Sequence, residues 1–306
     1  MAAGVSSPRV LVTGGSGAIG RHVVTAMIAR GWDVLALTHR NSIATPDGPG
    51  RLRLETGSIA SDEVLDTAVA GVDAVCHLAA YIPPNYADPS EAERLMSVNA
   101  LGALRVALAA AKHGKRLVAC SSAQAYLYSE APVSEDAPIY PADRATYYLA
   151  SKLAGELYIE HLRRIAGLAA ITFRVGSCYG PGMPESALVG LFMRAASAGE
   201  PIDVRHGGIP SADLVWVHDI SRLILLAVES GDPGLYNAGS GEATSGLHLA
   251  EAVRDVFPER PVEIVVSPPR GALPMSFSAL SMAKSKAMWG HEPTPLPAGL
   301  SALRAA

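Results

Sequence analysis

Short apolar runs with β-branched residues alternate with stretches of helical periodicity over the first 175 residues of the chain. The strand-like runs lie at residues 9–14, 33–37, 51–56, 73–80, 115–122 and 168–175. The intervening stretches of helical spacing lie at 18–30, 62–70, 89–113 and from 146 onward. Strands that are apolar on both faces are typical of a parallel sheet covered by helices. The pattern therefore predicts an α/β fold, a Rossmann-type doubly wound parallel sheet of about seven strands.

The regular alternation ends near residue 176. Beyond it proline and glycine become frequent, as in "CYGPGMP" and "HEPTPLP", and short strands mix with helices. We therefore expect a first domain over residues 1–175, with return segments near 214–240. A smaller C-terminal α/β lobe is expected over 176–213 and 241–306.

Composition narrows the classes of partner. The chain has 306 residues, 49% of them apolar, and a net charge of −4. This charge gives no reason to expect nucleic acid or an anionic membrane as a partner. The first ten residues lack the pattern of a secretory signal, and no uninterrupted apolar run reaches the roughly 18 residues of a membrane helix. We expect a cytoplasmic protein that acts on a small molecule.

Three cysteines, Cys76, Cys120 and Cys178, lie in apolar, strand-like surroundings. They cannot all pair with one another, and no two of them have the spacing of metal ligands. Reduced, buried thiols are therefore the expectation, and no metal site is predicted.

The turn after the first predicted strand reads "VTGGSGAIGRH". Its glycines satisfy both G-x-G-x-x-G and the looser G-x-x-G-x-x-G. Glycines allow a tight turn and a close backbone approach to a pyrophosphate, and the following helix N-terminus favours negative charge. A plain tight turn is the alternative, but at the first strand–helix junction of a β-α-β chain the pattern indicates a dinucleotide site. The expected contacts are Gly14, Gly17, Ala18, Ile19 and Gly20.

The second predicted strand ends in Thr38, His39 and Arg40. An NAD site commonly places an acidic residue here, which binds the free ribose hydroxyls. The missing acid and the nearby guanidinium favour the 2′-phosphate of NADP, with NAD as the alternative. A solvated loop arginine is the other interpretation of Arg40.

Tyr148 and Lys152 are spaced as Y-x-x-x-K and so lie on one face of a helix. A neighbouring ammonium favours a phenolate, and this would make Tyr148 a general acid/base. Tyr147 has only Ser151 at the same spacing. Alone, the pattern is equally typical of a buried tyrosine with a surface lysine. Upstream, however, the strand "LVACSS" ends at Ser122, where a hydroxyl could bind a substrate oxygen.

From these motifs the chain resembles the extended short-chain dehydrogenase/reductase family, commonly labelled NAD-dependent epimerase/dehydratase. The resemblance runs nearly end to end. The segments that carry it are "VTGGSGAIG", "CHLAA", "SVNALGALRVALAA", "CSSAQAY", "YLASK", "RVGSCYGPG", "LYNAGSGEATS" and "SKAMWGHEP".

The resemblance implies a role for each matched position. Tyr148 exchanges a proton with the substrate, Lys152 lowers the Tyr148 pKa and binds the nicotinamide ribose, and Ser122 orients the reacting oxygen. The first domain then binds the dinucleotide and the C-terminal lobe binds the substrate. Further cofactor contacts are implied at Ser58, Ile59, Leu78, Ala79, Ala80 and Asn99. The helices that begin near Ser90 and Thr146 are implied to pair in a homodimer.

Departures from the family pattern concern the substrate. Ala123 and Gln124 occupy the positions of the Asp-Glu pair of sugar-nucleotide dehydratases, which makes dehydration improbable. Ser177 replaces an asparagine, and Ala212 replaces an arginine that pairs with a pyrophosphate. Arg205, His206 or Arg270 could substitute for it. The expected substrate contacts are Tyr81, Ser122, Ala123, Gln124, Ser177 and Arg270.

Three functions remain open from the sequence. The first is an NAD(P)-dependent oxidoreductase that transfers hydride at a secondary alcohol or ketone carbon of a sugar, sugar nucleotide or related compound. The second is a nucleotide-sugar epimerase with tightly bound NAD. The third is a dinucleotide-sensing protein without catalysis, which the Tyr148–Lys152 pair disfavours.

Overall fold

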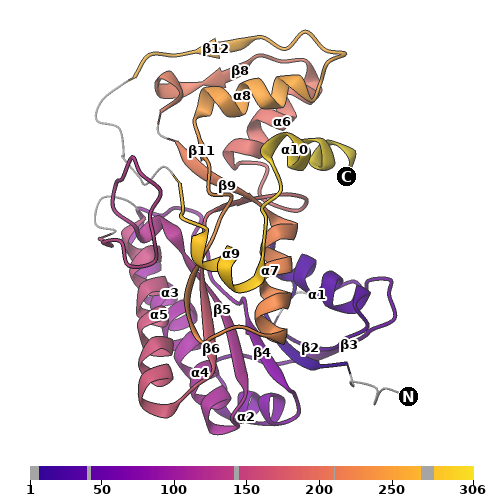
Figure 1. Ribbon diagram of the computed structural model, residues 1–306, viewed down its shortest axis with the longest axis vertical. Helices are drawn as coiled ribbons and strands as arrows, with labels where there is room; N and C mark the ends of the chain where they lie inside the picture. The colour runs from indigo at the N-terminus through magenta and orange to yellow at the C-terminus, as the bar shows by residue number, and fades with distance from the viewer. Residues whose placement is uncertain (1–6, 40–42, 141–144, 210, 270–278) are drawn as a thin grey trace. The chain divides into compact units, whose positions relative to one another are not determined.

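The computed structural model describes residues 7–39, 43–140, 145–209, 211–269 and 279–306 (Figure 1). The chain forms two compact units. Unit 1 comprises Met1–Ser122, Arg144–Arg174 and Ser221–Tyr236, and unit 2 comprises Ala123–Asp143, Val175–Ile220 and Asn237–Ala306. Residues 123–143 thus fall in unit 2, within the span expected for the first domain.

Unit 1 is built on a seven-stranded sheet of order β10-β6-β5-β4-β1-β2-β3. The strands are β1 (Arg9–Thr13), β2 (Asp33–Thr38), β3 (Arg51–Thr56), β4 (Ala74–His77), β5 (Arg116–Ser122), β6 (Ala170–Val175) and β10 (Gly234–Ala238). β1 pairs in parallel with β2 on one side and β4 on the other, so the strand order reverses beside β1. The predicted doubly wound sheet is confirmed, and its switch point lies at the carboxyl ends of β1 and β4.

Helices cover both faces of the sheet. They are α1 (Gly20–Ala29), α2 (Asp62–Ala70), α4 (Gly102–Lys112), α5 (Thr146–Ala166) and α7 (Val217–Glu229). Figure 1 shows α4 and α5 on one side of the strands and α1 on the other. Leu11, Leu65, Val106 and Ile159 belong to one buried core that joins the sheet to α2, α4 and α5. Strand residues alternate between the two faces, so the central strands β4 and β6, which are buried on both faces, are largely apolar throughout, whereas the edge strand β3 carries charged residues.

The helical stretch before β5 is not uniform. A 3₁₀ turn (Pro89–Glu91) is followed by α3 (Ala92–Leu95), a π-helical turn (Met96–Leu101) and α4. The segment "SEAE" predicts a capping box formed by Ser90 and Glu93, but the structure has its cap at Asp88. The Asp88 carboxylate accepts hydrogen bonds from the Ser90 N–H at 2.9 Å and the Ser90 hydroxyl at 2.7 Å. Pro89 takes the first helical position, where no N–H is needed, so the cap falls two residues before Ser90.

Among the described residues, one helical stretch, Pro89–Lys112, has the length and mean hydropathy of a membrane-spanning helix. A core helix of a globular protein meets the same criterion, and Leu95, Val106 and Ala110 on this stretch are fully buried. A single stretch of this kind is a weak indication of a membrane.

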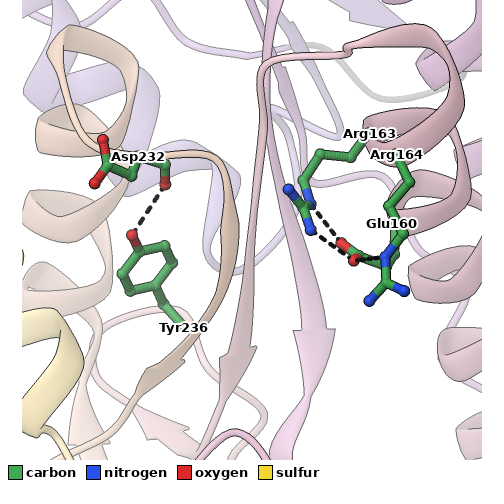
Figure 2. Close-up of polar contacts among 5 residues, drawn as sticks. All are labelled: Glu160, Arg163, Arg164, Asp232 and Tyr236. Atoms are coloured by element: carbon green, nitrogen blue, oxygen red, sulfur yellow. Dashed lines mark hydrogen bonds and ion pairs between the residues drawn. The ribbon is translucent and has the colours of Figure 1, made fainter.

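Polar contacts fix two short segments of unit 1, the last turns of α5 and the residues that lead into β10 (Figure 2). On the last turns of α5, the Glu160 carboxylate accepts hydrogen bonds from Arg163 at 2.7 and 2.8 Å and from Arg164 at 2.6 Å. At the entry to β10, the Tyr236 hydroxyl donates to the Asp232 carbonyl at 2.9 Å. The two arginines also lie where the helix dipole favours positive charge.

Unit 2 has two small sheets, of order β11-β9-β7 and β12-β8. Its strands are β7 (Ser177–Tyr179), β8 (Ile202–Val204), β9 (Ala212–Trp216), β11 (Ala243–Thr244) and β12 (Ile264–Val266). Its helices are α6 (Leu188–Ala198), α8 (Gly246–Asp255), α9 (Ala283–Trp289) and α10 (Leu296–Ala305). The buried Asp213 carboxylate joins distant segments by accepting hydrogen bonds from the N–H groups of Ser240, Gly241 and Leu280 at 2.6–3.0 Å.

Candidate active site

The glycine turn packs directly against the end of β4. Gly14 has a φ of +75°, and its carbonyl accepts a hydrogen bond from the Gly17 N–H at 3.0 Å. A Cβ atom on Gly14 would lie 2.6 Å from Ala79 Cα, and one on Gly20 would lie 2.8 Å from Gly15 Cα. Both positions therefore require glycine. The turn that opens α1 lies beside Leu78–Ala79, as a dinucleotide site at the switch point requires.

The carboxyl ends of β2 and β3 hold the residues expected near the adenosine. The Thr38 hydroxyl donates to the Glu55 carbonyl at 3.3 Å, and the Thr38 carbonyl accepts from the Gly57 N–H at 2.9 Å. Ser58 Oγ accepts a hydrogen bond from the Ala60 N–H at 3.1 Å. His39 is exposed, and Arg40 lies outside the described residues. This edge of the sheet thus carries the hydroxyl groups of Thr38 and Ser58, and Ile59 packs as an apolar neighbour against the core of unit 1.

Asn99 lies on the π-helical turn and is almost fully buried. Its Oδ1 accepts a hydrogen bond from the Tyr81 N–H at 2.7 Å, and its Nδ2 donates to the Tyr81 carbonyl at 3.0 Å. The same Nδ2 donates to Ser151 Oγ at 3.0 Å, and Ser151 in turn donates to the Tyr148 carbonyl at 2.7 Å. π-Helical turns occur frequently at functional sites. Here the turn places one amide between the segment after β4 and the first turn of α5.

Tyr148 and Lys152 are both partly buried on the first two turns of α5, which packs against β5. Ser122 is the last residue of β5 and is 8% exposed. Cys120 on the same strand is close enough to influence the pKa values of both Tyr148 and Lys152. The ring of Tyr86 meets the Tyr148 ring edge-on, with centroids 5.6 Å apart. Tyr147, by contrast, is 36% exposed.

Burial raises the pKa of Tyr148 well above its usual value, and Tyr86 and Cys120 act in the same direction. Burial lowers the pKa of Lys152, while Cys120 and Glu156 raise it. A Tyr148 pKa lowered by Lys152, as expected from the sequence, is therefore not found in the protein without cofactor and substrate. Spacing places the two side chains on one face, but the removal of water from the phenol is the main cause of the raised Tyr148 pKa.

His77 ends β4 beside the glycine turn and is 5% exposed. Its Nδ1 shares a hydrogen bond of 2.8 Å with Thr13 Oγ1. Burial, with a smaller contribution from the charge of Lys152, lowers the pKa of His77 to about 3. The histidine is thus neutral near pH 7 and packed in the core.

The expected substrate residues separate into groups. Tyr81 donates from its hydroxyl to Glu91 at 2.9 Å, and the Arg94 guanidinium stacks 3.8 Å from its ring, so its side chain is committed to the start of the next helix. In unit 2, Gln124 Nε2 donates to Ser177 Oγ at 3.5 Å. Ala123 is fully buried, and Arg270 lies outside the described residues.

Unit 2 contains a cavity of about 620 Å³. Ser177 and Ala212 line it from β7 and β9, and Ala187–Val189 line it from the start of α6. Arg194 and Arg304 also reach its wall. Ala187 provides no side-chain cap for α6, so the first N–H groups of this helix remain available to an anion.

Three residues near the catalytic pair were not singled out from the sequence as site residues. Tyr86 contacts Tyr148, and Cys120 and Glu156 influence Lys152. Glu156 follows Lys152 by one helical turn, a spacing that could have indicated the contact. Among the described residues, no group of three or more His, Cys, Asp or Glu side chains could hold a metal ion.

Comparisons with known proteins agree with this geometry. The family model described as "NAD dependent epimerase/dehydratase family" matches residues 10–239. The UDP-glucose 4-epimerase of Mycolicibacterium smegmatis is 27% identical over 301 residues, which cover 93% of each chain. The structure of Thermotoga maritima UDP-glucose 4-epimerase with UDP-glucose is 27% identical, with a TM-score of 0.82 and 97% of each chain covered. MoeE5 in complex with UDP-glucuronic acid and NAD is also 27% identical, with a TM-score of 0.82 over 97% of this chain and 98% of that one.

Proposed function

The chain belongs to the NAD dependent epimerase/dehydratase family, and on this basis we propose that it epimerises a sugar nucleotide by transient oxidation of a secondary alcohol. The observation that carries the proposal is the Tyr148–Lys152 pair on α5, packed against the strand that ends in Ser122. Ala123 and Gln124 argue against a dehydratase, because neither side chain can serve as the acid or base of an elimination.

The roles follow from the chemistry of the three side chains. Tyr148, as phenolate, takes the proton of the reacting hydroxyl, while Ser122 donates a hydrogen bond that orients the same oxygen. When bound, the nicotinamide would serve first as the hydride acceptor. Once the ketone has rotated to present its opposite face, the reduced nicotinamide would serve as the hydride donor. In this proposal the Lys152 ammonium stabilises the Tyr148 phenolate during turnover and binds the ribose hydroxyls of the cofactor. Tyr148 then returns its proton to the substrate oxygen, which gives the alcohol of inverted configuration.

The substrate class is proposed from the cavity of unit 2. A helix N-terminus without a side-chain cap and the Arg194 guanidinium favour a ligand that carries phosphate, whereas Arg304 is paired with Glu259. UDP-glucose and UDP-glucuronic acid are the ligands of the two similar structures described above, which supports a nucleoside-diphosphate sugar.

NAD is proposed as the cofactor, in agreement with the name of the family and the NAD bound to MoeE5. The expectation of NADP from Thr38, His39 and Arg40 stays a prediction. It also favours a second candidate function, net oxidation or reduction with an exchangeable cofactor. Denaturation of the purified protein and identification of the released dinucleotide separate the two. Retained NAD supports the epimerase, whereas a cofactor-free protein that binds NADPH more tightly than NADH supports the reductase.

The direct test is turnover. We expect the purified protein to interconvert UDP-glucose and UDP-galactose, or a related epimeric pair, without added reductant. Tyr148→Phe should retain NAD binding and lose about 10²–10⁴-fold in kcat. Tyr147→Phe, the adjacent and more exposed tyrosine, is the matched control and should remain active. Equal activity of the two variants would refute the catalytic assignment.

A homodimer is proposed through α4 and α5. Leu108 on α4 and Leu157 and Ile165 on α5 are 48%, 62% and 66% exposed, although they are large and apolar. Clustered exposed side chains of this kind are typical of an association surface. Light scattering should give twice the monomer mass, and Leu157→Glu should give the monomer.

A cytoplasmic location stays a prediction, supported by the proposed sugar-nucleotide substrate.

A further inference from the structure

A small cavity is lined by Lys152 within unit 1. It is bounded by β4, β5, β6, α4 and α5 and has a volume of about 10 Å³. A space of this size holds about one water molecule. Lys152, Glu156, Ser121, Thr172 and His77 all line it. The cavity is therefore polar as well as roomy enough for a water, the two conditions that distinguish a hydrated site from a dry one.

The hydroxyl of Ser121 requires a partner at this place. Ser121 is 6% exposed, and its Oγ makes no hydrogen bond to any of the described residues. An unsatisfied buried hydroxyl costs about 1–3 kcal/mol. Its neighbour in the chain, Ser122, is the residue assigned to the substrate oxygen. Because successive side chains of a strand point to opposite faces, Ser121 lies on the side of the cavity and Ser122 on the side assigned to the substrate.

Glu156 brings a buried negative charge to the same cavity. It follows Lys152 by one helical turn, and its carboxylate accepts two hydrogen bonds from Arg174, at 3.1 Å from Nε and 2.5 Å from Nη2. The side chains of Glu156 and Arg174 are only 9% and 5% exposed. The carboxylate is therefore fixed in place and cannot turn away from the lysine.

We propose that the cavity holds one ordered water that joins the Ser121 hydroxyl, the Lys152 ammonium and the Glu156 carboxylate. In this arrangement Glu156 is a positioning residue that keeps Lys152 protonated beside Tyr148. The inference rests on the proposed function for the meaning of that charge, because only a charged Lys152 can stabilise the Tyr148 phenolate.

The surrounding groups do not replace the carboxylate. On β4, His77 is neutral near pH 7, because burial lowers its pKa to about 3. On β5, burial raises the pKa of the Cys120 thiol to about 11. On β6, Arg174 is a second cation, and on α5 burial raises the pKa of the Tyr148 phenol, so in the protein without cofactor and substrate Tyr148 adds no negative charge. Glu156 is therefore the group that counteracts the lowering of the Lys152 pKa by burial near neutral pH.

Titration of Lys152 tests the inference without any substrate. ¹⁵N-lysine NMR of the intact protein, with the Lys152 signal assigned from a Lys152→Arg variant, reports its pKa directly. In Glu156→Gln we expect titration at least about one pH unit lower. Glu160→Gln removes a carboxylate paired with arginine one turn further along α5, and it should leave Lys152 unchanged. If Glu156→Gln does not fold because Arg174 is left unpaired, Glu156→Gln/Arg174→Met removes both charges and should show the same direction of shift.

The water itself is tested by crystallography at high resolution. Wild-type protein should show one ordered water within hydrogen-bond distance of Ser121 Oγ, and Ser121→Ala should lose it. An empty cavity in the wild type, or equal Lys152 titration in the Glu156→Gln and Glu160→Gln variants, would overturn the inference. Failure of the proposed function looks different: Tyr148→Phe would turn over normally, whatever the titration of Lys152.

Discussion

Replacement of Gly14 by alanine separates two reasons why a glycine can be required. Gly14 has a φ of +75°, and its added Cβ would lie 2.6 Å from Ala79 Cα, closer than real Cβ atoms come to backbone. Gly114, after α4, has a φ of +61°, but a Cβ there would have no atom within 4 Å. Gly114→Ala is therefore a matched control that carries the left-handed backbone cost without the collision.

The magnitudes follow from these two terms. The left-handed conformation costs about 1–2 kcal/mol in each variant. The collision at Gly14 adds about 1–3 kcal/mol, the usual cost of an overfilled site. This extra cost can lower the free energy of unfolding, or it can displace the turn from Leu78–Ala79. A displaced turn would weaken NAD binding by about 5- to 150-fold for the same free energy.

Two measurements together show whether the extra free energy of the Gly14→Ala collision appears as lost stability or as weaker NAD binding. Urea unfolding followed by circular dichroism gives the stability of Gly14→Ala relative to Gly114→Ala, and calorimetric titration gives the dissociation constant of NAD for each. We expect Gly114→Ala to bind NAD as the wild type does. If Gly14→Ala matched Gly114→Ala within about 0.5 kcal/mol in both measurements, the packing of the turn against β4 would be refuted.

Three further predictions concern buried or paired polar groups. Asn99→Ala removes three buried hydrogen bonds and should lower kcat at least about tenfold and stability by about 2–4 kcal/mol, measured by steady-state kinetics and urea unfolding; an Asn99→Ala enzyme with wild-type kcat would contradict a positioning role. Glu160, whose pKa its two arginines lower from 4.5 to about 2, contributes stability above pH 4.5 that is lost as the pH falls toward 2. Because its partners are partly exposed, we expect Glu160→Gln to cost only about 1 kcal/mol at pH 7 and less at pH 3; an equal cost at both values would exclude the ion pair. Asp213→Ala leaves three backbone N–H groups in unit 2 without their carboxylate and should cost about 3–5 kcal/mol by urea unfolding, whereas Asp213→Asn should cost less; equal stability of the two variants would show that the lost acceptor is unimportant.

The sequence predicts those parts of the site that depend on local patterns. The strand ends, the glycine turn before α1 and the shared face of Tyr148 and Lys152 all follow from periodicity and glycine spacing, because each depends on residues close together in the chain. The alternation of strands and helices also predicts the doubly wound parallel sheet, whereas the strand order that places the switch point at β1 and β4 comes from the structure.

The parts that could not be predicted depend on contacts across the fold. No pattern indicates that the Tyr81 hydroxyl would bind Glu91 and that its ring would stack on Arg94. The raised pKa of Tyr148 depends on how much water the surrounding elements exclude, and helical spacing carries no information on that. The cap at Asp88 could not be predicted because Asp88 and Ser90 are both good capping residues. Pro89, which lies between them and takes the first helical position, decides that Asp88 is used.

The π-helical turn at Met96–Leu101 also constrains how this helix can change in evolution. A π turn contains one residue more than an α turn of similar rise. Deletion of one residue within it would restore a regular α turn, and the helical segments on either side would keep their phase. Asn99, inside the turn, would lose the orientation that reaches both Tyr81 and Ser151. The extra residue is thus needed for the direction of one side chain and not for the course of the helix, so its deletion should be selected against even though the helix would continue without it.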